Sequence, residues 1–158
     1  MDVEIIIGTA EQALEVEALI PEFETTRSIE DYEAELSDRP HVILVALADG
    51  KPVAFKVAYE QSPGTLFIWT GGVAPEFRSH GIAKDLLDYQ ENWAKENGYN
   101  RIDVYTYNAF PSMLKLLITF GYKIVGFYEH INANCSRVDL SKCLVETEEE
   151  EQKYWFPI

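Results

Sequence analysis

The feature that most limits the fold of this chain is a change of hydrophobic period near residue 80. Residues 41–74 consist of apolar runs separated by the turn signals Asp49-Gly50 and Ser62-Pro63-Gly64. After them, apolar residues recur every three or four positions from Ile82 to Trp93, which is the period of an amphipathic helix. The pattern therefore predicts three antiparallel strands that lead directly into a helix.

The rest of the chain alternates between helical and extended patterns. N-capping signals at Thr9 and Ser28 predict two helices before the three strands. In chain order, we expect strands at 3–7, 41–48, 52–60, 65–74, 102–107, 122–131 and 135–145, and helices at 9–19, 28–36, 82–96 and 112–120. The order β-α-α-β-β-β-α-β-α-β-β predicts an α/β fold, with an α+β mixed sheet in one layered core.

Length and composition restrict the class of protein further. The 158 residues, 47% of them hydrophobic, predict a single domain at 1–145 followed by an acidic and aromatic tail at 146–158. No apolar run is long enough to span a membrane, and the acidic start Met1–Glu4 does not have the pattern of a secretory signal. Cys135 and Cys143, if both lie on the last strand, would be roughly 26 Å apart, too far for a disulfide. With only two cysteines, the sequence predicts a cytoplasmic protein.

The charge of the chain is unevenly distributed. The formal net charge is −14, and residues 1–38 hold twelve acidic residues against one base, Arg27. Residues 39–145 are nearly neutral, with ten acidic and eleven basic residues. Because such a surface repels phosphate backbones, we expect no nucleic-acid partner. No His or Cys pair has the spacing of metal ligands, so we also expect no metal.

The segment that carries chemistry is Val73–Ala83, which joins a predicted strand to a predicted helix. Gly81 permits a tight turn or the close approach of a ligand. The N–H groups of Arg78–Ala83 can then face outward together at the helix N-terminus, where the side chain of Lys84 or Arg78 would add positive charge. Such a loop is suited to the phosphates of a cofactor, although an ordinary strand-to-helix turn can have the same spacing.

This segment resembles the acyl-CoA signature of the GNAT superfamily of N-acetyltransferases. That signature is an apolar strand, a proline, Arg/Gln-x-x-Gly-x-Gly/Ala and an amphipathic helix. The element order over residues 3–145 is similar to the GNAT fold, as are Asn108 after the next strand and Gly121-Tyr122 after the apolar helix. The resemblance implies acetyl-CoA as co-substrate, in an opening between the strands that end at Val73 and Tyr107. It implies cofactor contacts at Val73, Ala74, Arg78, Ser79, His80, Gly81, Ile82, Ala83 and Asn108.

The resemblance does not assign the catalytic residues, which stay unknown. Where many family members have a tyrosine acid, this chain has Leu117, and Thr65–Val73 has no carboxylate to match the glutamate base of other members. Several residues remain as candidates: Tyr105, Tyr107 and Tyr128 as acids, and Glu24 and Glu60 as bases that act through water. A CoA thiolate could also leave without a dedicated acid.

Four aromatic and glycine residues on the same predicted strand have expected roles. Gly71-Gly72 would favour a β-bulge that separates this strand from its parallel neighbour. Phe67 and Trp69 would either line an aromatic acceptor pocket or pack in the core.

We therefore predict an N-acetyltransferase that moves the acetyl group of acetyl-CoA to a primary amine of a small molecule or peptide by direct attack. The acidic residues 1–38 predict a cationic acceptor, unless they only keep the surface solvated. The missing acid and base favour an alternative, a non-catalytic acyl-CoA sensor or regulatory module. A different phosphate-bearing nucleotide in the same loop is a third interpretation. Tyr154–Phe156 predict docking on the domain or on a partner subunit, with a homodimer as one outcome.

Overall fold

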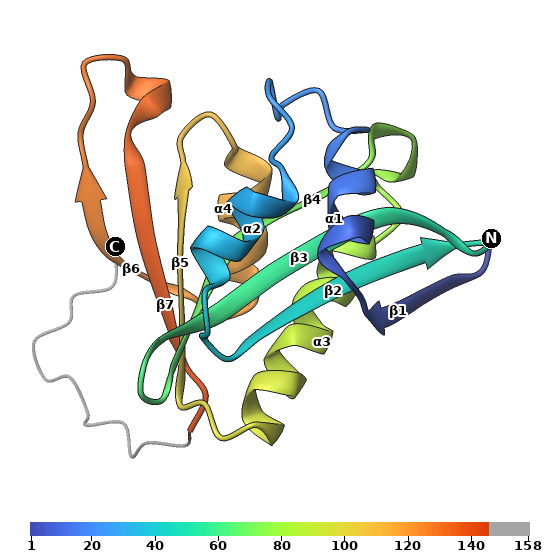
Figure 1. The fold of residues 1–158 in the computed structure, drawn as a ribbon. Helices are drawn as coiled ribbons and strands as arrows, with labels where there is room; N and C mark the ends of the chain where they lie inside the picture. The colour runs from blue at the N-terminus through green and yellow to red at the C-terminus, as the bar shows by residue number, and fades with distance from the viewer. Residues whose placement is uncertain (146–158) are drawn as a thin grey trace, which may run out of the picture.

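The computed structural model describes residues 1–145, and the predicted tail at 146–158 lies outside the described residues. A seven-stranded mixed sheet of order β1-β2-β3-β4-β5-β7-β6 forms the centre of the fold (Figure 1). The strands are β1 (Val3–Ile7), β2 (His41–Ala48), β3 (Lys51–Ser62), β4 (Thr65–Val73), β5 (Arg101–Tyr107), β6 (Lys123–Tyr128) and β7 (Arg137–Cys143). The helices are α1 (Ala10–Glu17), α2 (Ile29–Leu36), α3 (Ile82–Glu96) and α4 (Pro111–Thr119), with short 3-10 helices η1 (Pro75–Phe77) and η2 (Ala133–Cys135).

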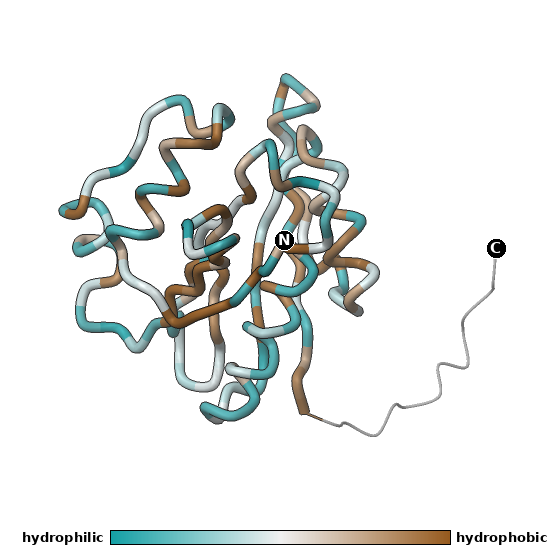
Figure 2. The backbone as a smooth tube through the Cα atoms, turned by 90° about the vertical axis from the view of Figure 1, so that its right-hand side faces the viewer, coloured by the Kyte–Doolittle hydropathy of each residue, from teal (hydrophilic) through white to brown (hydrophobic). Residues whose placement is uncertain are grey.

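The helices cover the two faces of the sheet in pairs. Helices α1 and α2 bury Val16 and Tyr32 against Phe55 of β3 on one face. Helices α3 and α4 bury Leu87 and Leu117 in a second cluster on the other face. Figure 2 shows the chain from the side, with hydrophobic stretches concentrated in the strands between these layers. The predicted mixed-sheet fold is confirmed, including the order of all its helices and strands.

Local side-chain bonds fix where the first two helices begin. The Thr9 side chain accepts the N–H of Gln12 at 3.2 Å, and the Gln12 side chain accepts the N–H of Thr9 at 3.0 Å. Ser28 and Asp31 make the same reciprocal pair at the start of α2. Each pair satisfies two backbone donors that a helix N-terminus leaves free, so both predicted starts are confirmed.

The last hairpin is shorter than predicted. Strand β6 ends at Tyr128, and β7 begins only at Arg137. Between them, the Asn132 side chain accepts the N–H of Asn134, and the Ser136 hydroxyl accepts the N–H of His130. These local bonds replace the pairing of the strands. Cys135 therefore lies in η2 rather than on β7, and both cysteines are free.

Candidate active site

Strands β4 and β5 diverge towards their C-terminal ends and open the sheet there. Their parallel pairing joins only Thr65–Ile68 to Arg101–Val104. Beyond this pairing, β4 continues to Val73 and β5 to Tyr107. The strands therefore separate where the resemblance implied an opening, between the ends of β4 and β5.

The divergence begins at a β-bulge formed by Trp69. Ile68 and Thr70 pair with consecutive residues of β3, which leaves Trp69 between them without a partner on that strand. The bulge predicted at Gly71-Gly72 is wrong, because both glycines stay in register with β3. Their lack of a side chain permits close packing instead: a Cβ on Gly72 would lie 2.7 Å from Cδ1 of Ile20.

The hydrogen-bond pattern of β4 directs part of its backbone into the opening. The N–H of Ala74 donates to the carbonyl of Val53 at 2.8 Å. Because bonded and non-bonded pairs alternate along antiparallel strands, Gly71 and Val73 direct their N–H groups away from β3. These two donors therefore face the space between β4 and β5.

The loop between β4 and α3 exposes a run of backbone donors. Ser79 and Gly81 both have left-handed backbone angles, with φ of 66° and 78°. Within residues 1–145, no hydrogen bond uses the N–H groups of Ser79–Lys84. Consecutive free N–H groups at the start of a long helix attract anions, so this loop has the form of a phosphate site. The sequence predicted the turn at Gly81 but not the left-handed backbone of Ser79.

The side chain of Arg78 joins this loop to the segment that follows α1. Its Nε–H donates to the carbonyl of Val73 at 3.0 Å, and its terminal nitrogens contact the Glu22 carboxylate at 3.1 and 2.5 Å. Hydrogen bonds from Arg78 lower the pKa of the Glu22 carboxyl below its ordinary value. The guanidinium thus fixes the α1–α2 segment to the end of β4, a contact that the sequence did not suggest.

Asn108 follows β5 on the other side of the opening. Its backbone N–H donates to the carbonyl of Ser136, and its side-chain N–H donates to the carbonyl of Ala133 at 3.1 Å. These bonds attach the end of β5 to the loop between β6 and β7. The side-chain oxygen of Asn108 has no hydrogen-bond partner within residues 1–145.

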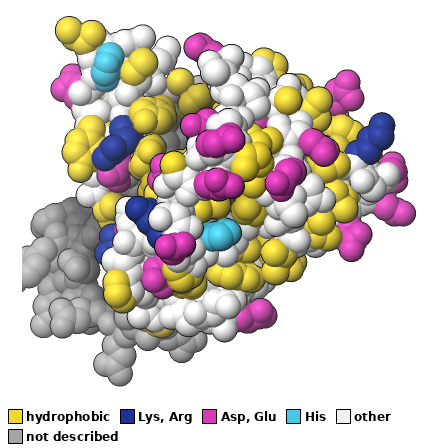
Figure 3. Space-filling model, in the orientation of Figure 1, with side chains coloured by type: hydrophobic (Ala, Val, Ile, Leu, Met, Phe, Trp, Pro, Cys, Tyr) yellow, Lys and Arg dark blue, Asp and Glu magenta, His cyan; other side chains and the backbone are white. Residues whose placement is uncertain are grey.

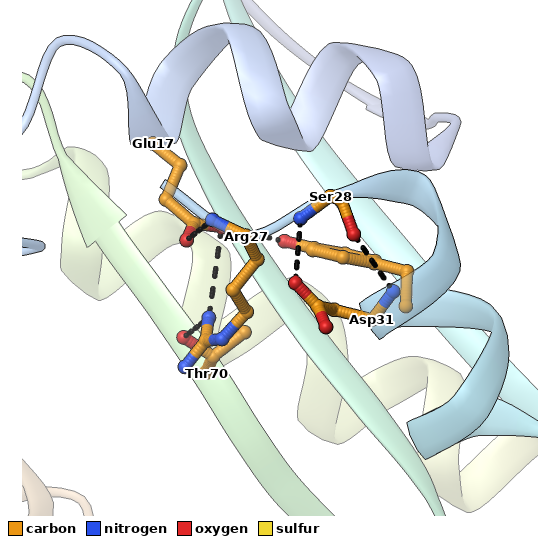
Figure 4. Close-up of polar contacts among 6 residues, drawn as sticks. Glu17, Arg27, Ser28, Asp31 and Thr70 are labelled. Atoms are coloured by element: carbon orange, nitrogen blue, oxygen red, sulfur yellow. Dashed lines mark hydrogen bonds and ion pairs between the residues drawn. The ribbon is translucent and has the colours of Figure 1, made fainter. Parts of the chain in front are cut away.

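The buried carboxylate of Glu17 is the centre of a polar network that joins α1 and α2 to β4 (Figure 4). Glu17 is 1% exposed and accepts the N–H of Arg27 and the hydroxyl of Tyr32, each at 3.1 Å. The Arg27 guanidinium donates to the Thr70 hydroxyl at 3.0 Å and lies 4.6 Å from the centre of the Trp69 ring. One network therefore connects both helices to β4 beside its bulge.

Trp69 packs against a core residue and also borders a groove. Its ring packs edge-on against Tyr32, with 5.0 Å between the ring centres. It also lines an open groove of about 590 Å³. The remaining residues that line this groove are Thr25, Thr26, Arg27, Asp31, Ala34 and Glu35. Phe67, in contrast, is 7% exposed and belongs to the core.

We expect Tyr32→Phe to lower the free energy of unfolding by about 2 kcal/mol, because a buried bond to a charged acceptor is lost. Burial and the neighbouring Glu17 carboxylate raise the pKa of the Tyr32 hydroxyl, so it stays protonated and donating. Urea denaturation measures the change. Tyr89→Phe, at an exposed position on α3, should leave stability unchanged. Equal losses in the two variants would contradict the role given to the Glu17 network.

Comparison with known proteins identifies the family. Residues 11–122, most of the chain, match the family model described as the acetyltransferase (GNAT) family. The chain belongs to this family. A search of curated protein sequences finds no significant match.

Solved structures of GNAT acetyltransferases share the fold. The ribosomal-protein-S18-alanine N-acetyltransferase of Escherichia coli superposes with a TM-score of 0.79 at 12% identity, over 98% of this chain and 100% of that one. The IAA acetyltransferase of Bacillus cereus gives 0.68 at 22% identity, over 90% and 98% of the two chains. A Bacillus subtilis acetyltransferase in complex with CoA gives 0.71 at 19% identity, over 90% and 98%. At these identities the likeness shows the fold alone.

The two positions that the resemblance matched to a tyrosine acid and a glutamate base of other family members hold apolar side chains here. Leu117 is fully buried in the core under α4, and Phe67 is buried on β4. Glu60 pairs with Leu66 near the start of β4, at the opposite end of the sheet from Val73, so it lies too far from the opening to act there. Its candidacy as a base is therefore wrong on geometric grounds.

The remaining candidates are three tyrosines on β5 and β6 and one glutamate on the α1–α2 segment. Tyr105 and Tyr128 are 38% and 56% exposed, and the Arg137 guanidinium lies over both rings, 4.8 and 4.4 Å from their centres. Tyr107 stands edge-on to Tyr105. Glu24 is exposed on the α1–α2 segment. The catalytic acid and base therefore stay unassigned.

The described residues contain neither a candidate membrane-spanning helix nor a candidate metal site. Within residues 1–145, no helix is both long and apolar enough to cross a membrane. The same residues contain no group of three or more His, Cys, Asp or Glu side chains placed to hold a metal ion.

Proposed function

We propose that this GNAT protein is an N-acetyltransferase that uses acetyl-CoA to acetylate a primary amine. The observation that carries the proposal is the junction of two features: the opening between β4 and β5, and the loop of free N–H groups where α3 begins. An extended chain with an anionic end fits such a junction, because one part can pair with strand backbone while the other binds at the helix N-terminus. A cofactor with a pantetheine arm and a pyrophosphate has this form.

The cofactor would use mainly backbone groups. The pantetheine amides would pair with β4 at Val73, since the N–H of Ala74 already donates to the carbonyl of Val53. The pyrophosphate would lie on the N–H groups of Ser79, His80, Gly81, Ile82 and Ala83. The N–H of Arg78 donates to the carbonyl of Pro75 at 3.3 Å, so the expectation that it also faces the phosphates is wrong. Asn108 would contact the arm from β5. The pairing of Arg78 with Glu22 leaves Lys84, exposed in the first turn of α3, as the freer cation beside the phosphates.

The reaction would be a direct transfer without a covalent enzyme intermediate. The neutral amine attacks the thioester carbon, a C–N bond forms, and the C–S bond breaks to release CoA thiolate. The N–H of Val73 or Gly71 would donate to the thioester oxygen as it gains negative charge, a contribution worth about 3 kcal/mol in comparable sites. One proton leaves the attacking nitrogen and one is taken up by the thiolate.

The acceptor would be cationic. Acidic side chains are spread over the middle of the face that carries α1 and α2, with few Lys or Arg among them (Figure 3). Residues 1–38 hold twelve acidic residues and one base, and Arg27 is already paired with buried Glu17. A polyamine, an aminoglycoside or a basic peptide would be attracted to this face, and salt would weaken the attraction.

The alternative function is an acyl-CoA sensor or regulatory module without turnover. One observation favours it: the two family positions for acid and base are occupied by buried Leu117 and Phe67. Both functions use the same cofactor loop, so they differ only in whether an amine is acetylated.

Thiol release from acetyl-CoA tests the proposal directly. We expect turnover with polyamines, aminoglycosides or lysine peptides, little with neutral amines, and weaker turnover as salt increases. A thermal scan is the binding control: acetyl-CoA at 100 times Kd should add about 2.7 kcal/mol, or roughly 5–10 °C. A thermal shift without turnover on any amine would support the sensor. Absence of both, with a shift from ATP instead, would overturn acetyl-CoA as the cofactor.

A further inference from the structure

Lys56 is a charged residue within the apolar strand β3, and nothing in residues 1–145 pairs with its charge. Only 6% of the residue is exposed. Burial is the one cause that lowers the pKa of its ammonium, and no hydrogen bond or charged neighbour opposes it. An unpaired charge that is removed from water weakens a fold. Such residues are more typical of functional sites than of structural cores.

The side chain of Lys56 leans across β4. Lys56 lies opposite Gly71 on that strand, and a Cβ placed on Gly71 would be 3.3 Å from Cγ of Lys56. Residues that face each other on antiparallel strands normally keep their Cβ atoms about 4.5–5.5 Å apart. The lysine stem therefore occupies the space that a side chain at position 71 would fill, and it runs toward the far side of β4.

The ammonium of Lys56 reaches solvent at the opening between β4 and β5. Within residues 1–145, the enclosed side-chain atoms that lack a partner belong to Gln90, Glu91 and Tyr122. Nζ of Lys56 also lacks a partner but is not enclosed, so it touches solvent. Gly71 is half-buried, and at its level β4 no longer pairs with β5. The other neighbours of Lys56 on this face of the sheet are fully buried: Leu44, Ala54 and Ala58.

This position brings the ammonium to the reacting end of the proposed cofactor. The N–H groups of Gly71 and Val73 face the opening, and one of them would donate to the thioester oxygen. Lys56 lies directly beside the first of these donors in the sheet register. The thioester sulfur is bonded to the same carbon as this oxygen, so it would lie beside the same donors, within reach of the lysine side chain.

We propose that Lys56 is the acid of the acetyl transfer, and that its ammonium gives a proton to the sulfur of CoA as the C–S bond breaks. The electron pair of that bond stays on sulfur and takes the proton from Nζ. The attacking nitrogen loses its own proton to water, and the neutral amine of Lys56 regains one from water afterwards. The inference rests on the proposed function. It supplies an acid in a chain where the tyrosine position of the family holds buried Leu117.

The surroundings of Lys56 suit a proton donor near neutral pH. Its partners across β2 and β4 are Leu44 and Gly71, and the buried residues of β5 and α4 carry no charge. The charged residue among the buried residues of α3 is Glu91, which is paired with Lys142. Burial lowers the pKa of the Lys56 ammonium to about 8. It is therefore protonated at pH 7 but releases its proton more readily than an exposed lysine does.

Lys56→Met tests the role in turnover. We expect kcat to fall about 100-fold, as on loss of a general acid, while the affinity for acetyl-CoA stays within threefold. In the starting protein, kcat should fall as pH rises through about 8, because the ammonium is then lost, and Lys56→Met should lack this fall. Lys51→Met, at an exposed position on the same strand, is the matched control and should keep both kcat and its pH profile. An unchanged kcat in Lys56→Met, or the same pH profile in both proteins, would overturn the inference and leave the proposed function standing.

The complex with CoA tests the contact without any acceptor. The ultraviolet absorbance of the thiolate, followed against pH, gives the pKa of the bound thiol. We expect this pKa to lie about one pH unit below that of free CoA, because a nearby ammonium favours the thiolate, and to return toward the free value in Lys56→Met. An equal thiol pKa in the two complexes would overturn the inference, and a failure to bind CoA would overturn the proposed function with it. A lowered thiol pKa without turnover on any amine would support the contact of Lys56 with the sulfur and overturn the N-acetyltransferase instead.

Discussion

Acetyl-CoA binding should weaken about 100-fold when Ala83 is replaced by glutamate, while the fold is kept. Ala83 is the second residue of α3, inside the run of free N–H groups from Ser79 to Lys84. A carboxylate there would lie roughly 5 Å from a bound phosphate and repel it by about 3 kcal/mol at an effective dielectric constant near 20. The same carboxylate favours the positive end of the helix, by about 0.5 kcal/mol.

Ala83→Glu should therefore weaken acetyl-CoA binding and slightly stabilise the protein without cofactor. A variant that merely unfolded would lose both binding and stability. Calorimetry gives the affinity for acetyl-CoA, and a thermal scan without cofactor gives the stability. Asn92→Glu adds the same charge to the exposed side of the same helix and should leave the affinity unchanged. Repulsion from Asp88 and Glu96, four positions away on either side, should lower its stability by about 0.5 kcal/mol. If the affinity for acetyl-CoA stays within threefold of that of the starting protein, the loop before α3 does not bind the cofactor phosphates.

Features formed by residues that are close together in the chain could be predicted from the sequence. The capping pairs at Thr9 and Ser28 join residues three positions apart, and both form as expected. The loop from Val73 to α3 also depends on neighbouring residues, so its proline, arginine and glycine indicate its form. In each case the interacting groups are close in the chain, and short-range geometry decides the structure.

The long-range contacts around the end of β4 could not be predicted. Arg27 bonds Thr70 from 43 positions away, and Arg78 bonds Glu22 from 56 positions away. The bulge is at Trp69 rather than at the neighbouring glycines, because register with β3 depends on both strands. Such pairings follow from the packing of elements, and no local pattern in the sequence indicates them.

The burial of Lys56 is another feature that could not be predicted from the sequence pattern. It lies within the apolar strand β3, opposite Leu44 and Gly71, and only 6% of it is exposed. Side chains alternate along a strand, so Lys56 shares the face of Ala54 and Ala58, which belong to the cluster beneath α3. Burial lowers the pKa of its ammonium from 10.5 to about 8. The charged form is therefore disfavoured in the folded state.

We expect Lys56→Met to raise the free energy of unfolding at pH 7 by about 3 kcal/mol. The unfolded chain keeps the ordinary lysine pKa, so the depression to about 8 in the folded state is worth about 1.4 kcal/mol for each pH unit between the two values. Below pH 8 both states carry the charge, and the folded state bears the full cost. Methionine has a similar length and no charge to bury.

The pH dependence distinguishes this cause from ordinary repacking. Between about pH 8 and 10.5 the unfolded chain binds a proton that the folded protein does not, so the starting protein gains stability as pH rises. The advantage of Lys56→Met should therefore shrink through this range and be nearly lost at its upper end. Urea denaturation at pH 7, 8, 9 and 10 measures it. Lys51→Met, at an exposed position on the same strand, should stay within about 0.5 kcal/mol at every pH. A stabilisation by Lys56→Met that does not vary with pH would mean that packing, and not the buried charge, limits stability at this position.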